Sequence, residues 1–372
     1  MSAVRDAIVV AGPGDAERRI AGVPLLLRTL LVLQRAGVER CTLVGARVPA
    51  DPRLRLAVAP AASLAPLPDD ALRIVVGPNA VVDGTLVAAL ARRARAGTVV
   101  EVEADGVRVR VAPGPLVATN GGAGTPPPAG TLCAASAPAV ERRLLRGLEN
   151  ARDGYLDRAL FRRGSRAVTP LLLRTPLSAN AVTLVGIAVG ILGGVLLGAV
   201  TWWGVLAGVG CLAVSGILDC ADGELARLRF TESALGYWLD VVGDTVVHLA
   251  VVAGIALRLA RAGTVPPWPV FALLGAGIVG AFVAMTWSEH VEERRRRAGG
   301  WENAVLDGVL SPLSTRDWHV FVVAFALAGR LDLLVLGGAI GAHAFWLVVA
   351  ALLLRVLARA RQLQASVARV RQ

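Results

Sequence analysis

The C-terminal part of the chain alternates long apolar runs with short polar breaks. Most runs approach the roughly 20 residues that a helix needs to cross the hydrocarbon core of a bilayer. The stretch PLSANAVT, at residues 176–183, precedes the first run and offers Ser178 or Asn180 as a helix cap. The pattern predicts an all-α membrane domain at 177–372 with six transmembrane helices. The predicted spans are about 181–200, 203–222, 235–258, 267–287, 317–331 and 333–357.

The first 138 residues have the shorter hydrophobic pattern of a soluble domain. Strand-like apolar runs alternate there with helical periodicity, and the first strand, helix and second strand form a βαβ unit. This order predicts a small, open, Rossmann-like α/β sheet. The predicted elements are strands at 7–14, 40–46 and 72–76, helices at 23–38 and near 86–96, and a hairpin turned at Asp105 and Gly106.

Residues 139–176 combine leucine and arginine positions at helical spacing. An amphipathic helix of this kind is expected to lie along the cytoplasmic membrane surface, with its leucines in the lipid and its arginines among the headgroups. A plain linker helix is the alternative. We therefore expect a cytoplasmic domain at 1–138, an interfacial helix and linker at 139–176, and the membrane domain at 177–372.

Composition agrees with a membrane protein. Of 372 residues, 55% are hydrophobic, and the mean hydropathy of +0.60 is too high for a soluble domain alone. The formal net charge is +11 and every basic side chain is arginine, which a GC-rich genome explains, although such a surface also attracts anionic lipid and phosphate. Nucleic acid is not expected as a partner, because the arginines fall at membrane edges rather than among exposed aromatics. The arginine distribution places both termini on the cytoplasmic side of a bacterial or archaeal cell membrane.

Four carboxylates interrupt two of the apolar runs, where an ionised group costs a few kcal/mol or more unless it is paired or bound to metal. Asp219 and Asp222 are three residues apart and share one face of a helix. Gly236, Asp240 and Asp244 are spaced by four and line one face of the next helix. Two helices can thus direct oxygen ligands at one point, which indicates a Mg²⁺ or Mn²⁺ site at the cytoplasmic side.

These residues resemble the signature of the CDP-alcohol phosphotransferase family, which is D-x-x-D-G-x-x-A-R, eight residues, and then G-x-x-x-D-x-x-x-D. All of its fixed positions are present, as Asp219, Asp222, Gly223, Ala226, Arg227, Gly236, Asp240 and Asp244. In this family the hydroxyl of an acceptor alcohol attacks a phosphorus of a CDP-alcohol, and CMP leaves.

The resemblance implies roles for these residues. Two divalent ions, Mg²⁺ or Mn²⁺, are expected on Asp219, Asp222, Asp240 and Asp244. Asp244 is expected to act as the general base, although the residues alone do not separate a base from a ligand. The resemblance also implies a homodimer. The residues expected to bind CDP are Asp219, Asp222, Gly223, Ala226, Arg227 and Gly236.

The segment STRDWHVF is similar to segments in relatives that use phosphorylated inositol. Arg316 in this segment is therefore a candidate for binding an acceptor phosphate. An interfacial ion pair between Arg316 and Asp317 is the alternative. The expected acceptor is an alcohol or an inositol phosphate.

Residues 20–45 are similar to the sugar-nucleotide and cytidylyltransferase family, which has a nucleotidyltransferase-like fold. The chain departs from that family at the positions that bind phosphate and metal. Its phosphate loop is short and lacks a lysine, Asn79 stands where a metal-binding Asp is usual, and no acid occurs at 132–140 before Glu141. We expect this domain to be non-catalytic, because a metal without anionic ligands cannot be held to neutralise a triphosphate. Its fusion to the membrane domain resembles the bifunctional enzymes that make di-inositol phosphate compounds.

Three other functions fit parts of the pattern. A phospholipid synthase with CDP-diacylglycerol as donor is a close variant. A transporter or cation channel lined by the four aspartates belongs to another class. A third possibility is a nucleotide-sensing scaffold whose membrane domain is inert. The glycine and alanine positions between the acids favour the transferase, because ion passage does not need them.

Overall fold

The computed structural model divides the chain into two compact units. The N-terminal unit consists of Met1–Leu148 and Arg227–Thr231, and the membrane unit consists of Glu149–Ala226 and Glu232–Gln372. The five residues Arg227–Thr231, here called the connector, are thus counted with the N-terminal unit, although the first three of them are the last residues of the membrane helix Trp202–Arg229. The structure describes residues 6–11, 14, 18–61, 73–76, 81, 100–104, 107–112, 137–148, 160–263, 266–310 and 318–370.

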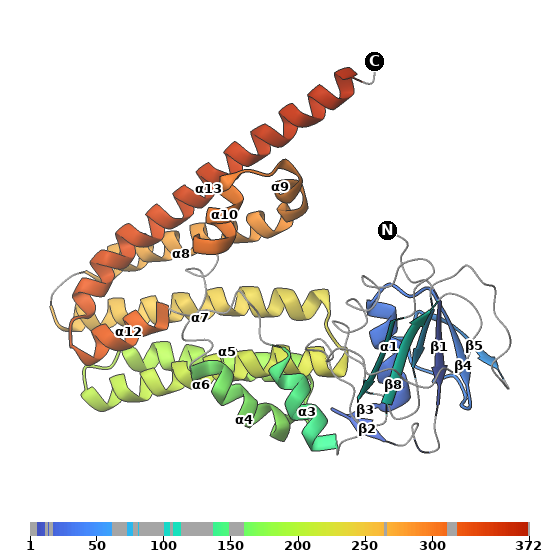
Figure 1. Ribbon diagram of the computed structural model, residues 1–372. Coiled ribbons are helices and arrows are strands. Elements are labelled where there is room, and N and C mark those ends of the chain that lie inside the picture. Colours follow the sequence, from blue (N-terminus) through green and yellow to red (C-terminus); the bar gives the residue numbers. More distant parts are fainter. Residues whose placement is uncertain are drawn as a thin grey trace. The chain divides into compact units, whose positions relative to one another are not determined.

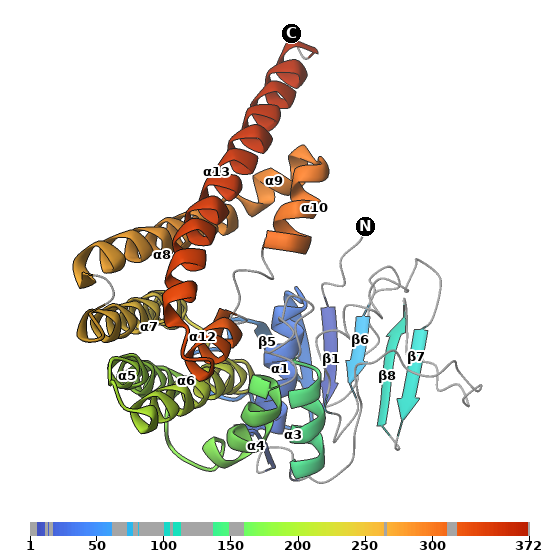
Figure 2. The same ribbon diagram turned by 90° about the vertical axis from the view of Figure 1, so that its left-hand side faces the viewer.

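A six-stranded mixed sheet forms the centre of the N-terminal unit, in the order β5-β4-β1-β6-β8-β7 (Figure 2). Strands β5, β4, β1 and β6 are parallel, and the β7–β8 hairpin adds antiparallel strands beside β6. The α/β character, the predicted strands and the hairpin are confirmed, whereas the Rossmann-like fold stays a prediction. The strands are β1 Asp6–Val10, β4 Arg40–Val44, β5 Ala57–Ala61, β6 Arg73–Val76, β7 Val100–Ala104 and β8 Val107–Ala112.

Two elements of this unit are not visible in the hydrophobic pattern. Strand β5 contains Pro60 and lies at the edge of the sheet, where a residue without a backbone N–H is tolerated. The two-residue strands β2 Arg19–Ile20 and β3 Val23–Pro24 form a small antiparallel pair just before the first helix. The helix predicted near 86–96 lies outside the described residues.

Helix α1, Leu25–Arg35, confirms the helix predicted at 23–38. It ends before Gly37, which has φ +88°, a left-handed conformation typical of a residue that follows a helix. The helix is buried from Leu25 to Leu33, Arg28 included. Its leucines pack with Val9, Leu43 and Phe230 of the connector in the main core of the unit.

The membrane unit is helical (Figure 1). Five helices of the described chain are long and apolar enough to cross a membrane: Ala179–Leu197, Trp202–Arg229, Ala234–Arg261, Trp268–His290 and Leu331–Ser366. The elements that follow the sheet are α3 Ala137–Arg146, α4 Arg162–Leu172, α5 Ala179–Leu197, α6 Trp202–Arg229, α7 Ala234–Arg261, α8 Pro267–His290, α9 Glu292–Ala298, α10 Trp301–Val305, the π-helical η2 Leu306–Leu310, α12 Trp318–Leu327 and α13 Leu331–Val370.

The six predicted spans are not all confirmed. The fifth, at 317–331, is represented by α12, which has only 10 residues among those described. At 1.5 Å per residue it rises about 15 Å, which is about half of the hydrocarbon core. Part of the predicted span and the segment before it, at 311–317, lie outside the described residues. The other five predicted spans correspond to α5, α6, α7, α8 and α13.

Glycines allow α5, α6 and α7 to pack closely. Figure 1 shows these three helices side by side. A Cβ atom at Gly194 of α5 would lie 2.6 Å from the carbonyl carbon of Ala250 on α7. One at Gly193 would lie 3.0 Å from the carbonyl oxygen of Gly208 on α6. Small residues of this kind let membrane helices approach at backbone distance. Helix α5 therefore packs against both helices that carry the aspartates.

The segment predicted as an interfacial helix contains two described helices. Helix α3 belongs to the N-terminal unit, and α4 belongs to the membrane unit. On α4 the buried residues are Arg162, Ser165 and Thr169, whereas Leu171 is exposed. The expectation that the arginines of this segment lie among headgroups, with the leucines in the lipid, is therefore wrong for Arg162, because its side chain is buried against protein.

Candidate metal centre

Three of the four signature aspartates converge between α6 and α7. Asp219, Asp222 and Asp240 each offer a carboxylate oxygen, and these oxygens all lie within 4.8 Å of one another. Asp222 is buried, and the other two are half-buried. Asp244 lies one helical turn beyond Asp240 on α7 and is outside this group. The structure thus brings together the two predicted halves of the motif.

The chemistry of this group fits a hard divalent cation. Three carboxylates at such short range repel one another when ionised, and a cation among them removes that repulsion. Mg²⁺ and Mn²⁺ prefer oxygen ligands, and Asp219, Asp222 and Asp240 supply only oxygen. Among the described residues, the Oδ1 atom of Asp240 is a buried oxygen with no hydrogen-bond partner, although Asp240 as a residue has other contacts.

Asp222 is oriented by the first membrane helix. The hydroxyl of Thr183 on α5 donates a hydrogen bond to Oδ2 of Asp222. Thr183 is buried, and α5 begins just before it, with the Ser178 hydroxyl accepting a bond from the N–H of Ala181 at 3.2 Å. Ser178 is therefore the cap, as the sequence predicts. The contribution of Thr183 was not predicted, and its only signal is a polar residue in an apolar span.

Glu224 is a second buried acid that the sequence does not single out. It lies at a variable position of the signature, two residues after Asp222, and is 1% exposed. Its carboxylate accepts hydrogen bonds from Thr169 Oγ1 at 2.7 Å, Ser165 Oγ at 2.8 Å and Arg162 Nη1 at 3.2 Å. All three donors belong to α4. Glu224 therefore anchors α4 to α6 and is occupied by these contacts rather than by metal.

The start of α7 is fixed by a cap and by a close approach. The Ser233 hydroxyl accepts a hydrogen bond from the N–H of Gly236 at 3.0 Å. A Cβ atom at Gly236 would lie 3.1 Å from Oδ1 of Asn180, so a larger residue would press against the start of α5. Ala226 and Arg227 are half-buried near the end of α6, and Ala226 packs beside Leu225.

Arg316, the candidate for the acceptor phosphate, lies outside the described part of the chain. So does Asn79, which stands where the cytidylyltransferase family usually has a metal-binding Asp. Glu141 is described, and one of its oxygens accepts a hydrogen bond from the N–H of Ala21 at 2.8 Å. This acid thus supports the turn between β2 and β3.

Arginines also line a cavity of about 700 Å³ where α8, α9 and α13 meet. Its polar side chains include Arg294, Arg297 and Arg361, and its apolar lining includes Trp287 and Leu357. The lining contains no carboxylate, so the cavity is suited to an anionic group rather than to a metal ion.

Residues 177–351 match the family model described as CDP-alcohol phosphatidyltransferase. Two curated proteins are similar over part of their length, and both are called "Bifunctional IPC transferase and DIPP synthase". The protein from Aquifex aeolicus (strain VF5) is 26% identical over 183 residues, which are 49% of this chain and 40% of that protein. The protein from Rubrobacter xylanophilus is 34% identical over 144 residues, which are 37% of this chain and 31% of that protein. The chain thus spans less than half the length of each of these relatives.

Proposed function

We propose that this chain, whose residues 177–351 match the CDP-alcohol phosphatidyltransferase family model, is an integral-membrane transferase that moves a substituted phosphate group from a CDP-alcohol to an acceptor alcohol and releases CMP. The observation that carries the proposal is the convergence of Asp219, Asp222 and Asp240 from two membrane helices. A cluster of three partly buried carboxylates costs free energy unless a cation offsets its charge.

The metal would serve the phosphate groups of the donor. When bound, one or two Mg²⁺ or Mn²⁺ ions neutralise the diphosphate and stabilise the leaving CMP. Asp219, Asp222 and Asp240 are the proposed ligands, with Asp244 as a further ligand or as the base. Thr183 holds one oxygen of Asp222 and would thereby fix the orientation of this proposed ligand.

The transfer itself requires a base and a surface for the donor. We assign Asp244 to accept the proton of the acceptor hydroxyl while that oxygen bonds to phosphorus and the bond from phosphorus to the CMP oxygen breaks. Arg227 is assigned to pair with phosphate. Gly223, Ala226 and Gly236 are small residues that let cytidine and diphosphate lie against the helices.

The proposed acceptor is an inositol phosphate or another sugar-like phosphate. The names of the two curated relatives and the segment STRDWHVF support it. A phospholipid synthase with CDP-diacylglycerol as donor is the second candidate. It is favoured by the apolar residues that α5 exposes along its length, such as Leu184, Leu192 and Val195, which can contact lipid tails.

Three further properties are part of the proposal. The N-terminal unit is non-catalytic, both termini and the metal centre face the cytoplasm, and two copies form a homodimer. The arginine distribution supports the orientation, and the engagement of Glu141 with Ala21 supports a structural use of the acid nearest the membrane region. Robust formation of CDP-inositol from CTP and inositol phosphate would overturn the first of these properties.

A donor-by-acceptor screen tests the proposed function. The full chain in lipid nanodiscs is given Mg²⁺ or Mn²⁺, a set of labelled CDP-alcohols and a set of acceptors, and CMP release is measured. We expect release only with one donor class and its matching acceptor, and none from Asp240→Asn combined with Asp244→Asn. Release that survives this double substitution would show that the assigned site is wrong.

A further inference from the structure

The connector, Arg227–Thr231, packs with the N-terminal unit. It joins the two halves of the acidic signature, because Asp219 and Asp222 precede it on α6 and Asp240 follows it on α7. Its residue Phe230 is 8% exposed and belongs to the same core cluster as the leucines of α1. The short link between the metal-binding helices is therefore embedded in the soluble part of the chain.

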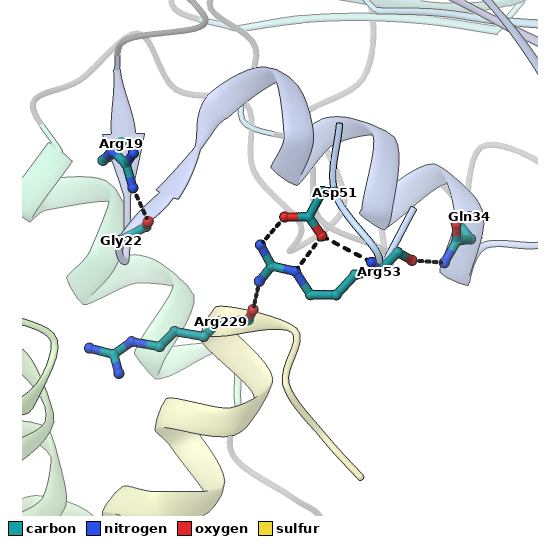
Figure 3. Close-up of polar contacts among 6 residues, drawn as sticks. All are labelled: Arg19, Gly22, Gln34, Asp51, Arg53 and Arg229. Carbon is teal, nitrogen blue, oxygen red and sulfur yellow. Dashed lines mark hydrogen bonds and ion pairs between the residues drawn. The ribbon is translucent and has the colours of Figure 1, made fainter. Parts of the chain in front are cut away.

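Two arginines of the N-terminal unit bind the backbone at the end of α6. Arg28 Nη1 on α1 donates to the carbonyl oxygen of Leu228 at 2.9 Å, and this contact is buried. Arg53 Nη1 donates to the carbonyl oxygen of Arg229 at 2.6 Å (Figure 3). The last carbonyls of a helix have no partner within the helix and carry partial negative charge, so guanidinium groups are suited to hold them.

Arg53 is itself held in place before it reaches the connector. Its Nε donates to Asp51 Oδ1 at 2.8 Å and its Nη2 donates to Asp51 Oδ2 at 2.7 Å, a two-point pair that Figure 3 shows beside the Arg229 carbonyl. The hydrogen bonds from Arg53 lower the pKa of the Asp51 carboxyl below its usual value. Gln34 Nε2 donates to the carbonyl oxygen of Arg53 at 3.0 Å and ties this loop to α1.

Phe230 adds an apolar anchor at the point where α6 ends. Its φ of +56° lies in the left-handed region, which is unfavourable for a residue with a side chain. The buried ring offsets this cost through core packing and through the guanidinium carbons of Arg28 and Arg35, which lie 5.1 Å and 4.2 Å from its centroid. Backbone and side chain of the connector are thus both fixed by the N-terminal unit.

We propose that Arg28, Arg53 and Phe230 are positioning residues for the metal centre. By fixing where α6 ends and where the chain turns toward α7, they set the separation between the carboxylates of α6 and Asp240. Metal ligands must be held to within about half an ångström, so a small shift of the helix end weakens the site. The expected effect on CMP release rests on the proposed function. On this proposal, the N-terminal unit has the structural role of holding the end of α6.

The variants that test this proposal remove one anchor at a time from the full chain in nanodiscs. Phe230→Gly removes the ring and also relieves the unfavourable φ, so any loss reflects the missing anchor. Arg53→Ala removes the bond to the Arg229 carbonyl, and Arg53→Lys is a milder version that keeps the charge. Arg55→Ala is the matched control, because Arg55 is exposed on the same loop and is held there by its backbone N–H, which donates to Gln34 Oε1.

Three readouts are needed, namely Mn²⁺ affinity from electron paramagnetic resonance, hydrogen exchange of peptides covering 219–240, and CMP release with its metal dependence. We expect Phe230→Gly and Arg53→Ala to speed exchange in these peptides and to weaken Mn²⁺ binding roughly 10-fold. The metal concentration for half-maximal rate should rise by the same factor. Arg53→Lys should fall between wild type and Arg53→Ala, and Arg55→Ala should match wild type.

Unchanged Mn²⁺ affinity in Phe230→Gly and Arg53→Ala would overturn the proposal, even if exchange becomes faster, because the connector would then be only a tether. If wild type binds Mn²⁺ but releases no CMP with any donor, the proposed function fails, whereas a weaker affinity in the variants still supports the positioning role. If wild type releases CMP and the variants behave like Arg55→Ala, the positioning role fails alone.

Discussion

The hydroxyl of Thr183 on α5 donates a hydrogen bond to Oδ2 of Asp222 on α6. This bond links the first membrane helix to the most deeply buried acid of the metal group. Partners of metal ligands fix the orientation of the ligand, and their loss typically weakens metal binding about 10- to 100-fold.

Thr183→Val should therefore weaken Mn²⁺ binding by about 10-fold or more, because it removes the hydroxyl and keeps the shape of the side chain. Thr183→Ser, which retains the hydroxyl, should remain close to wild type. Mn²⁺ titration followed by electron paramagnetic resonance measures the effect. Thr245→Val is the control, since within the described part of the chain the Thr245 hydroxyl donates to the carbonyl oxygen of Val241 in its own helix. Equal Mn²⁺ affinities in Thr183→Val and Thr245→Val would show that Thr183 does not orient Asp222 for metal binding.

Glu224 and Arg162 form a buried ion pair whose disruption should destabilise the membrane unit. Glu224→Ala leaves Arg162 without its carboxylate and removes the acceptor for Ser165 and Thr169. Loss of one partner from a buried pair costs about 3–5 kcal/mol. Thermal unfolding in detergent should show this loss, and Glu224→Gln, which keeps an acceptor oxygen, should lose less. Glu293→Ala breaks a pair with Arg297 that is about 80% exposed, so it should change stability by about 1 kcal/mol or less.

Because α5 packs closely against α7, replacement of Gly194 by alanine should affect stability more than replacement of Gly210. A methyl group at Gly194 would meet the backbone of Ala250, whereas one at Gly210 has nothing within 4 Å. Gly194→Ala should therefore destabilise the membrane unit by about 1–3 kcal/mol, because backbone atoms cannot move aside cheaply. Gly210→Ala should be neutral. Comparable melting temperatures for the two variants would contradict the observed approach of these helices.

Alkaline pH should destabilise the N-terminal unit through Cys41. Burial raises the pKa of the Cys41 thiol from 9.0 to about 12, although a backbone hydrogen bond with Val9 acts in the opposite direction. In the unfolded chain the thiol ionises near pH 9.0, its ordinary pKa. Between that pH and about 12 the folded chain keeps a proton that the unfolded chain has lost, so the free energy of unfolding falls as pH rises. Scanning fluorimetry from pH 8 to pH 10 should show a smaller decline in Cys41→Ala; equal declines would contradict the assignment.

The acidic motif could be predicted from sequence because its spacing matches helical periodicity. Residues three or four apart share a face, so Asp219 with Asp222, and Asp240 with Asp244, are paired by local geometry alone. Their convergence across two helices agrees with the sequence prediction of one cation site. Strands β1, β4 and β6, the β7–β8 hairpin and the first helix of the N-terminal unit followed from the sequence pattern in the same way, whereas β2, β3 and β5 did not.

Other features depend on contacts between distant parts of the chain. Arg28 and the Leu228 carbonyl are 200 residues apart in sequence, and no local pattern relates them. Thr183 and Glu224 look like isolated polar residues until packing supplies Asp222 and α4 as their partners. The fifth span was predicted from an apolar run, but hydropathy does not determine how much of such a run becomes helical.

The most direct test of the account is metal-dependent CMP release by Asp240→Asn beside Asp332→Asn. Asp332 is an exposed acid paired with Arg330 at the start of α13, so it controls for the loss of one charge. Wild type and Asp332→Asn should lose activity in chelator and regain it with Mn²⁺ or Mg²⁺. Asp240→Asn should stay on the order of 100-fold less active at any metal concentration tested. Activity of Asp240→Asn equal to that of Asp332→Asn would contradict the assignment of this site.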